Sequence, residues 1–170
     1  LAPLLYRHLS SACPDVLPKG ILQELQTHSL VNAKRSLFLT KALFKVLHAF
    51  EDNNISVLSI KGPTLAQKIY GDVTLRHFKD LDLLIPQEDF LQANNQLLSL
   101  GYRTEAALPT NHLVSLFQSR YQDGLHFISK DGEKLIHLHW ALTPCYLSFV
   151  PKVDHLWQRV LRTPLWNYSI

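Results

Sequence analysis

The sequence lacks most of the features that mark secreted, membrane and nucleic-acid-binding proteins. Its two cysteines, Cys13 and Cys145, form neither a metal-binding spacing nor a disulfide framework, which favours a reducing, cytoplasmic setting. No apolar run approaches the roughly 20 residues that span a bilayer, and the N-terminus has no basic-then-apolar signal pattern. The net charge of +3 comes without a dense basic run, so nothing in it points strongly to nucleic acid. We therefore expect a soluble, cytoplasmic protein with no membrane partner.

The 170 residues, 46% of them hydrophobic, are enough for one globular core. Apolar residues at three- and four-residue spacing in 1–9 and 21–50 predict amphipathic helices. We expect residues 1–52 to form an N-terminal helical segment that packs on a core made by residues 53–170. Because the chain begins at Leu1 rather than a methionine, we also expect it to be part of a longer protein whose core continues past residue 170.

The stretch from Val57 to Ile85 predicts a strand, a glycine turn, a helix and a second strand in that order. Gly62 permits a sharp turn after the first strand, and Pro63 suits the first position of a helix because its fixed φ is already helical. The start of that helix attracts anions. Taken alone, Lys61-Gly62-Pro63 is more simply an ordinary strand-to-helix turn.

Two aspartates lie on the second predicted strand. Side chains two residues apart on a strand share one face, so the Cα atoms of Asp80 and Asp82 would be about 6.5 Å apart and both carboxylates can reach a shared cation. Two acids side by side repel each other unless a cation intervenes, which a bound Mg²⁺ would provide. Arg76 is either a local ion-pair partner or a phosphate ligand, and the sequence leaves the two open.

Three histidines are predicted to share one face of a later hairpin. Asp131-Gly132 is a strong two-residue turn, and the register it sets places Ile128 opposite Leu135 and His126 opposite His137. His139 lies on the same face. The other face should be core and carries Phe127, Ile136, Leu138 and Trp140. The histidines indicate either a metal or phosphate site or a set of hydrogen-bonded structural residues.

Several short motifs occur together in a fixed order. They are Lys61-Gly62, Leu65-Ala66, Tyr70-Gly71-Asp72, Arg76, Asp80-x-Asp82-Leu83-Leu84 and Gly101-Tyr102. In this ordered set the chain resembles the uncharacterised bacterial nucleotidyltransferase family with the DNA polymerase β-like fold. The resemblance implies a glycine turn that cradles a triphosphate and an acidic pair that holds a divalent metal. His139 and Trp140 also match the family.

Two positions depart from the pattern of this family or its superfamily. Gly62-Pro63-Thr64 stands where the superfamily usually has Gly-Ser or Gly-Gly, and His137 stands where the family has an acid. Neutral imidazole binds Mg²⁺ poorly but accepts Mn²⁺ or Zn²⁺ well. His137 is therefore a general base, a ligand for a softer metal, or a sign that transferase activity has been lost.

The fold we predict is α/β (α+β): a mixed β-sheet nucleotidyltransferase-like core with flanking helices and an N-terminal helical segment. The predicted reaction moves a nucleoside monophosphate from a nucleoside triphosphate to the hydroxyl of an unknown acceptor, either a small molecule or a protein, with Mg²⁺ or Mn²⁺ as cofactor. The catalytic residues would be Asp80, Asp82 and His137, with the metal on the two aspartates. The nucleotide would contact Lys61, Gly62, Thr64 and Arg76. His126 and His139 would support the metal ligands.

Two other functions fit the same residues. The departure at His137 motivates the alternative function, a catalytically weakened nucleotidyltransferase-like module that binds a nucleotide or a protein partner. A histidine-rich metal hydrolase is the weaker third interpretation.

Overall fold

The computed structural model describes residues 1–13, 18–104, 122–133, 135–143, 154–160, 164–165 and 168–169. Its helices are α1 (Ala2–Ala12), α2 (Lys19–Glu51), α3 (Pro63–Tyr70), α4 (Phe90–Ser99) and α6 (Asp154–Trp157). Its strands are β1 (Leu58–Ser59), β2 (Asp80–Leu84), β3 (Tyr102–Thr104), β4 (Gly124–Ser129), β5 (Leu135–His139), β6 (Pro164–Leu165) and β7 (Tyr168–Ser169). Within these described residues, no helix has the length and apolar character of a membrane span.

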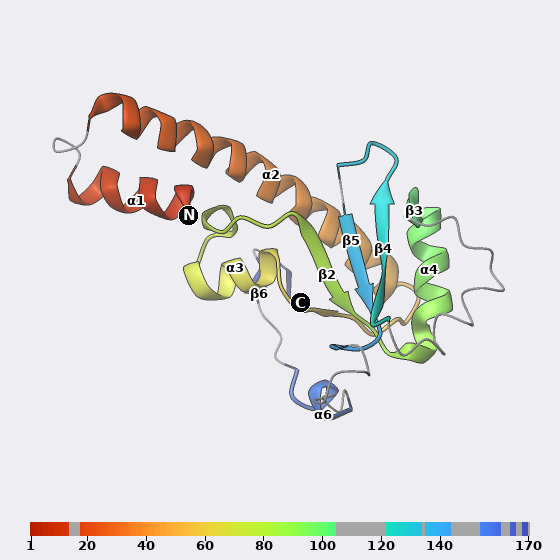
Figure 1. The fold of residues 1–170 in the computed structure, drawn as a ribbon. Helices are drawn as coiled ribbons and strands as arrows, with labels where there is room; N and C mark the ends of the chain where they lie inside the picture. The colour runs from red at the N-terminus through yellow and green to blue at the C-terminus, as the bar shows by residue number, and fades with distance from the viewer. Residues whose placement is uncertain are drawn as a thin grey trace.

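The main sheet has five strands in the order β1-β2-β5-β4-β3 (Figure 1). Strands β2 and β5 pair in parallel, and the other neighbours pair antiparallel. The mixed α+β class predicted from the sequence is therefore confirmed. The hairpin of β4 and β5 also has the predicted register, with His126 opposite His137 and Ile128 opposite Leu135.

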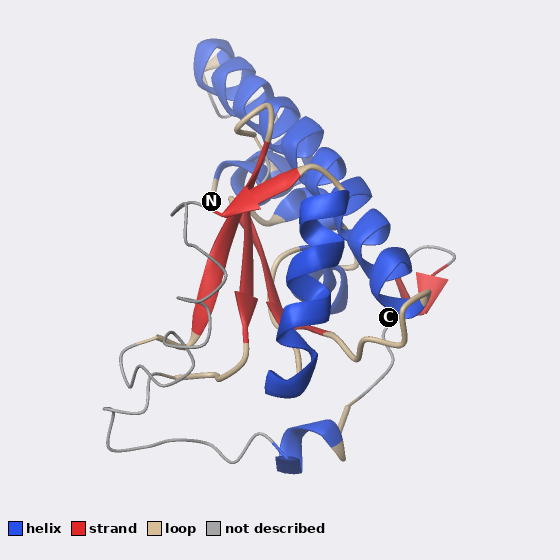
Figure 2. Ribbon diagram, turned by 90° about the vertical axis from the view of Figure 1, so that its right-hand side faces the viewer, coloured by secondary structure: helices blue, strands red, loops and turns tan. Residues whose placement is uncertain are grey.

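Helices α2 and α4 lie on one side of this sheet (Figure 2). The core between helices and sheet includes Leu43 and Phe50 of α2 and Leu97 of α4, each 0% exposed. Leu81 and Leu83 of β2 belong to the same core, and Phe127, Ile136, Leu138 and Trp140 supply the hairpin side of it, as predicted. Side chains alternate along a strand, so Asp80 and Asp82 point to the opposite face. We call that opposite side of the sheet the open face.

The predicted strand, glycine turn and helix are present at β1 and α3. Gly62 precedes α3 with φ 68°, a left-handed conformation that L side chains rarely adopt, and Pro63 is the first residue of the helix. A Cβ on Gly62 would lie 3.6 Å from the carbonyl oxygen of Asp80. The glycine bend therefore lies directly against the start of β2.

Candidate functional site

Asp82 is the centre of the polar residues on the open face. It is only 6% exposed. Its Oδ1 atom lies 3.2 Å from Nε2 of His139, 3.5 Å from Nζ of Lys61 and 3.9 Å from Nδ1 of His137. The hydrogen bond with His139 lowers the pKa of the Asp82 carboxyl, and this effect, aided by the Lys61 charge, outweighs the opposing effect of burial. Asp82 is therefore an anion at neutral pH.

The three histidine rings stack side by side across β4 and β5. The parallel pairing of β2 and β5 sets His137 opposite Asp82, and His139 follows two residues later on the same face. Ring centroids are 3.9 Å apart between His126 and His137 and 3.6 Å apart between His137 and His139. Burial, with the neighbouring His139 and His126, lowers the pKa of His137 to about 4. Its imidazole is neutral at pH 7, and its lone pair is available to a metal.

Asp82, His137 and His139 could together hold a metal ion, and we call them the Asp82 group. Each offers one ligand atom, and these atoms all lie within 4.8 Å of one another. Among the residues that the structure describes, Asp80 and His126 fall outside this group. Two imidazoles and one carboxylate suit Mn²⁺ or Zn²⁺ better than Mg²⁺, which prefers an all-oxygen shell. The donor set thus fits a divalent cation.

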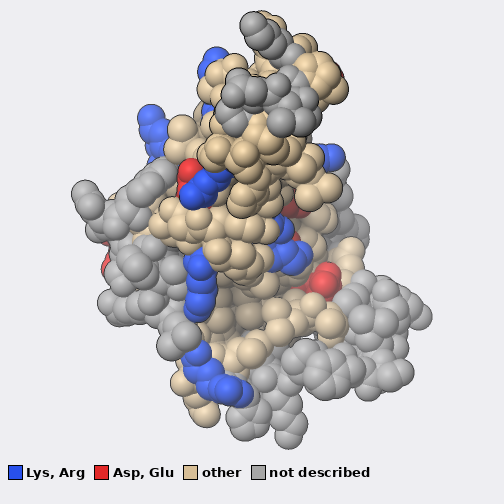
Figure 3. Space-filling model, turned by 90° about the vertical axis from the view of Figure 1, so that its left-hand side faces the viewer, with Lys and Arg blue, Asp and Glu red and all other residues tan. Residues whose placement is uncertain are grey.

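A pocket of about 340 Å³ adjoins the Asp82 group, and we call it the turn pocket. It is lined by Lys61, Gly62, Arg76, His77, Phe78, Lys79, Asp80 and Asp82. Nη1 of Arg76 is buried and has no hydrogen-bond partner among the described residues, so an anion in this pocket would satisfy it. The face seen in Figure 3 carries more basic than acidic side chains. Five of the predicted site residues therefore meet in one pocket with basic groups available for phosphate.

Thr64 is placed differently from the other predicted nucleotide ligands. Its hydroxyl donates a 2.8 Å hydrogen bond to Oγ of Ser59, and its side chain lines a neighbouring pocket instead of the turn pocket. His126 is exposed and contacts the Asp82 group only by stacking on His137.

Two residues at the start of the first histidine strand, Asp123 just before β4 and Gly124 as its first residue, were missed by the sequence analysis. Oδ2 of Asp123 lies 3.8 Å from Nδ1 of His139, on the side of the ring opposite Asp82. A Cβ on Gly124 would lie 2.8 Å from Nε2 of His137. The alternation of side chains along a strand could have placed Gly124 on the histidine face, because it is two residues before His126.

Comparisons with known proteins match the chain to a family and to solved structures. A family described as an uncharacterised nucleotidyltransferase matches residues 1–168. No curated protein matches the sequence. Two solved structures of the antibiotic-resistance factor ANT(2'')-Ia share 22% identity with the chain. The solution structure has a TM-score of 0.43 and covers 58% of this chain and 44% of its own. The crystal structure with adenylyl-2''-tobramycin has a TM-score of 0.44 and covers 59% and 48%.

The chain therefore spans less than half the length of these two solved structures. The family match covers nearly all of its 170 residues. The chain belongs to the uncharacterised nucleotidyltransferase family.

Proposed function

We propose that this chain transfers a nucleoside monophosphate from a nucleoside triphosphate to an acceptor hydroxyl with the help of a divalent metal. The observation that carries the proposal is the position of the Asp82 group at the edge of a pocket that also contains a glycine bend and an unpaired arginine nitrogen. Metal ligands beside a pocket of about 340 Å³ that contains basic side chains are what metal-dependent phosphoryl transfer needs.

The Asp82 group would hold the metal. When bound, the metal neutralises charge on the phosphates and polarises the phosphoryl group under attack. Because two of the three ligands are imidazoles, we propose Mn²⁺ as a better cofactor than Mg²⁺. Asp80 lines the turn pocket outside this group, and we propose that it joins the cation site once a triphosphate has bound.

Three groups would position the triphosphate. Arg76 offers its buried guanidinium nitrogen, Lys61 offers an exposed ammonium, and the bend at Gly62 lets the chain approach the phosphates closely at the start of α3. Holding the triphosphate in line with the acceptor is the main contribution of such groups.

The reaction forms one bond and breaks another. The acceptor oxygen bonds to the α-phosphorus while the bond from that phosphorus to the bridging oxygen breaks. Pyrophosphate leaves with the electron pair, and the hydroxyl proton passes to solvent. His137, with a pKa near 4, is a weak base at neutral pH, so we assign it to the metal and not to the proton.

Calorimetric titration of Mn²⁺ in the presence of ATP tests the metal site. We expect Asp82→Ala to abolish binding, since it removes the only carboxylate of the group and leaves two imidazoles unsupported. The control is His28→Ala, which removes an exposed imidazole on α2 whose nearest charged partner is Glu24. Equal Mn²⁺ affinity in both variants would refute the assignment.

Substitution of His137, the residue that departs from the family pattern, tests the metal preference. His137→Asp restores an oxygen donor, so we expect the ratio of Mg²⁺ to Mn²⁺ affinity to rise at least about tenfold. An unchanged ratio would mean that His137 is not a ligand.

A non-catalytic module that binds nucleotide is the second candidate, and the imidazole in place of an acid at position 137 favours it. Incubation with α-labelled triphosphates and a cell lysate separates the two. Label transfer that requires Asp82 supports the enzyme, and binding of ATP without transfer supports the module.

A further inference from the structure

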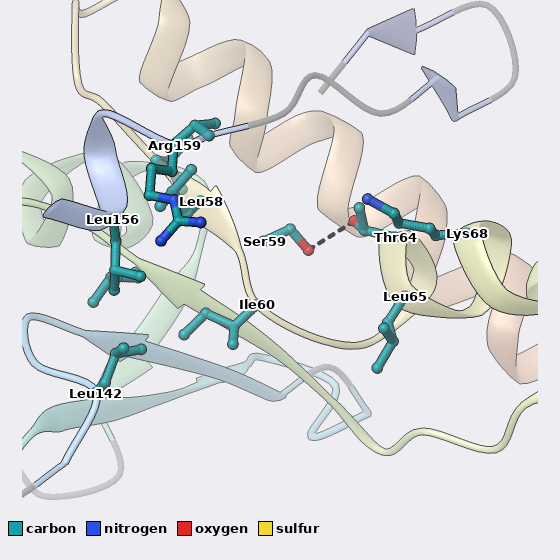
Figure 4. A pocket seen from close by; sticks show the side chains of 12 residues that line it. Leu58, Ser59, Ile60, Thr64, Leu65, Lys68, Leu142, Leu156 and Arg159 are labelled. Carbon is teal, nitrogen blue, oxygen red and sulfur yellow. Dashed lines mark hydrogen bonds between the residues drawn. The ribbon is translucent and has the colours of Figure 1, made fainter. Parts of the chain in front are cut away.

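A second pocket of about 430 Å³, which we call the edge pocket, is lined by residues of β1, β2 and α3 and by residues in and near α6 (Figure 4). Two of its lining residues, Leu58 and Leu84, pair across β1 and β2. Leu84 is two residues after Asp82 on β2, so both side chains point to the open face. Ile60, a third lining residue, donates its backbone N–H to the carbonyl oxygen of Asp82 at 3.0 Å. The floor of the edge pocket therefore continues directly into the metal ligands.

The chemistry of the edge pocket differs from that of the turn pocket. Its aliphatic lining consists of Val57, Leu58, Ile60, Leu65, Leu84, Leu142, Leu156 and Val160. The remaining lining residues are two hydroxyls, Ser59 and Thr64, and two cations, Lys68 and Arg159. No carboxylate lines it among the described residues. The pocket therefore combines apolar walls with positive charge.

The two cations come from different elements. Figure 4 shows Lys68 near Thr64 on α3 and Arg159 near Leu58, just after α6. No ion pair joins either cation to a carboxylate in the described part of the chain. Two unpaired cations on the rim of an apolar pocket attract a ligand with a negative group.

We infer that the edge pocket binds the acceptor of the transfer reaction and that this acceptor is a small anionic amphiphile. The inference rests on the proposed function. The triphosphate already has Lys61 and Arg76 in the turn pocket, so Lys68 and Arg159 remain for a second anion. A carboxylate or phosphate of the acceptor pairs with these cations at the rim, and its apolar body covers the aliphatic floor. A polycationic acceptor would meet two like charges and no carboxylate.

The orientation of the bound acceptor follows from where the residues of the edge pocket lie. Ile60 and Leu84 border Asp82, whereas Lys68 and Arg159 lie on other elements at the rim. An acceptor held at its anionic end by the rim therefore extends its opposite end, with the hydroxyl, toward the Asp82 group. A volume near 430 Å³ restricts it to a small molecule.

Calorimetric titration of three probes into the full chain tests both parts of the inference. The probes are octyl phosphate, octylamine and inorganic phosphate, each below the concentration at which it aggregates. We expect octyl phosphate to bind at least about tenfold more tightly than either of the others. Equal binding of octylamine would overturn the anionic part, and equal binding of inorganic phosphate would overturn the apolar part.

Substitutions that remove the two cations then test where octyl phosphate binds. We expect Lys68→Gln and Arg159→Gln each to weaken octyl phosphate binding about threefold to tenfold, because each removes one exposed cation. The matched control is Lys34→Gln, which removes an exposed lysine of α2 that does not line the edge pocket. If Lys34→Gln weakens binding as much as the other two, the effect is one of net charge and the site assignment is wrong.

An introduced negative charge gives a second test, at surface positions where the substitution leaves the core intact. Val160 lines the edge pocket and is 41% exposed, whereas Leu98 of α4 is 45% exposed and lies outside it. We expect Val160→Asp to weaken octyl phosphate binding at least about threefold and Leu98→Asp to leave it unchanged. Equal effects would overturn the assignment.

Titration of Mn²⁺ and ATP into the same preparation separates the two proposals. If Mn²⁺ and ATP bind but octyl phosphate does not, the acceptor inference is wrong and the proposed function stands. If octyl phosphate binds as described but Mn²⁺ and ATP do not, the pocket is a ligand site and the proposed function is wrong.

Discussion

Gly124 is the position at which a single methyl group should disturb the Asp82 group most. It lies on β4 opposite His139, in an extended conformation that any residue adopts, so backbone strain does not explain the glycine. The lack of space explains it, because a Cβ at this position would lie 2.7 Å from the carbonyl oxygen of Leu138 and 2.8 Å from Nε2 of His137. Real Cβ atoms essentially never approach this closely, and the carbonyl cannot move without opening the β4–β5 ladder.

We therefore expect Gly124→Ala to lower the free energy of unfolding by about 2 kcal/mol, the usual cost of overpacking a well-packed site. With a urea m-value of about 2 kcal/mol/M, the midpoint of urea unfolding should fall by about 1 M. Mn²⁺ affinity should fall at least about tenfold, because the ring of His137 is displaced from Asp82.

The matched control for this substitution is Gly20→Ala on α2. A Cβ on Gly20 meets nothing within 4 Å, so alanine there should stabilise the chain by about 0.5 kcal/mol through the better helix propensity. An unfolding midpoint and Mn²⁺ affinity for Gly124→Ala equal to those of the unsubstituted chain would refute the steric argument.

Three further predictions follow from the same contacts. Burial raises the pKa of Tyr102 to about 12, so the folded state holds its proton between about pH 10 and 12 while the unfolded state loses it. The free energy of unfolding should therefore fall by about 2 kcal/mol between pH 10 and pH 12. When the same pH series is measured by urea unfolding, Tyr102→Phe should not show this part of the decrease. Asp123→Asn should weaken Mn²⁺ binding about tenfold in calorimetry, because Asp123 faces the free ring nitrogen of His139; an unchanged affinity would contradict that role. Lys61→Met should tighten Mn²⁺ binding a few fold by removing a competing cation 3.5 Å from Asp82, yet weaken ATP binding; a change of both in the same direction would contradict the assignment.

The hairpin could be predicted from the sequence because its register is a local property. Asp131-Gly132 predicts which residues face each other, and alternation then assigns each side chain to a face. The structure has this register, although its turn is centred on Lys130 and Asp131, because the N–H of Gly132 donates to the carbonyl oxygen of Ser129. The histidine face, the core face and the pairing of His126 with His137 all follow from that turn. The strand, glycine bend and helix around Gly62 were predictable for the same reason, since each signal lies within a few residues of the others.

The contact between Asp82 and His137 could not be predicted in this way. It depends on the parallel pairing of β2 and β5, whose partners are 55 residues apart and are joined by no tight turn. The same pairing explains why Asp80 and Asp82 differ. Asp80 lies opposite Leu135 and stays outside the Asp82 group, whereas Asp82 lies opposite an imidazole. From the sequence the two aspartates are equivalent.

The two faces of β2 separate the residues that stabilise the core from the residues that we propose bind the metal. Leu81 and Leu83 are at most 1% exposed and pack against the helical core, so they fix the strand in place. Asp82, between them, presents its carboxylate on the open face, where it could hold a metal ion together with His137 and His139. Because neighbouring side chains point in opposite directions, we expect a conservative change at Asp82 to alter the proposed metal binding while the core that positions the strand is retained. Loss of the proposed metal binding with retained folding is therefore the expected outcome for a conservative substitution of Asp82.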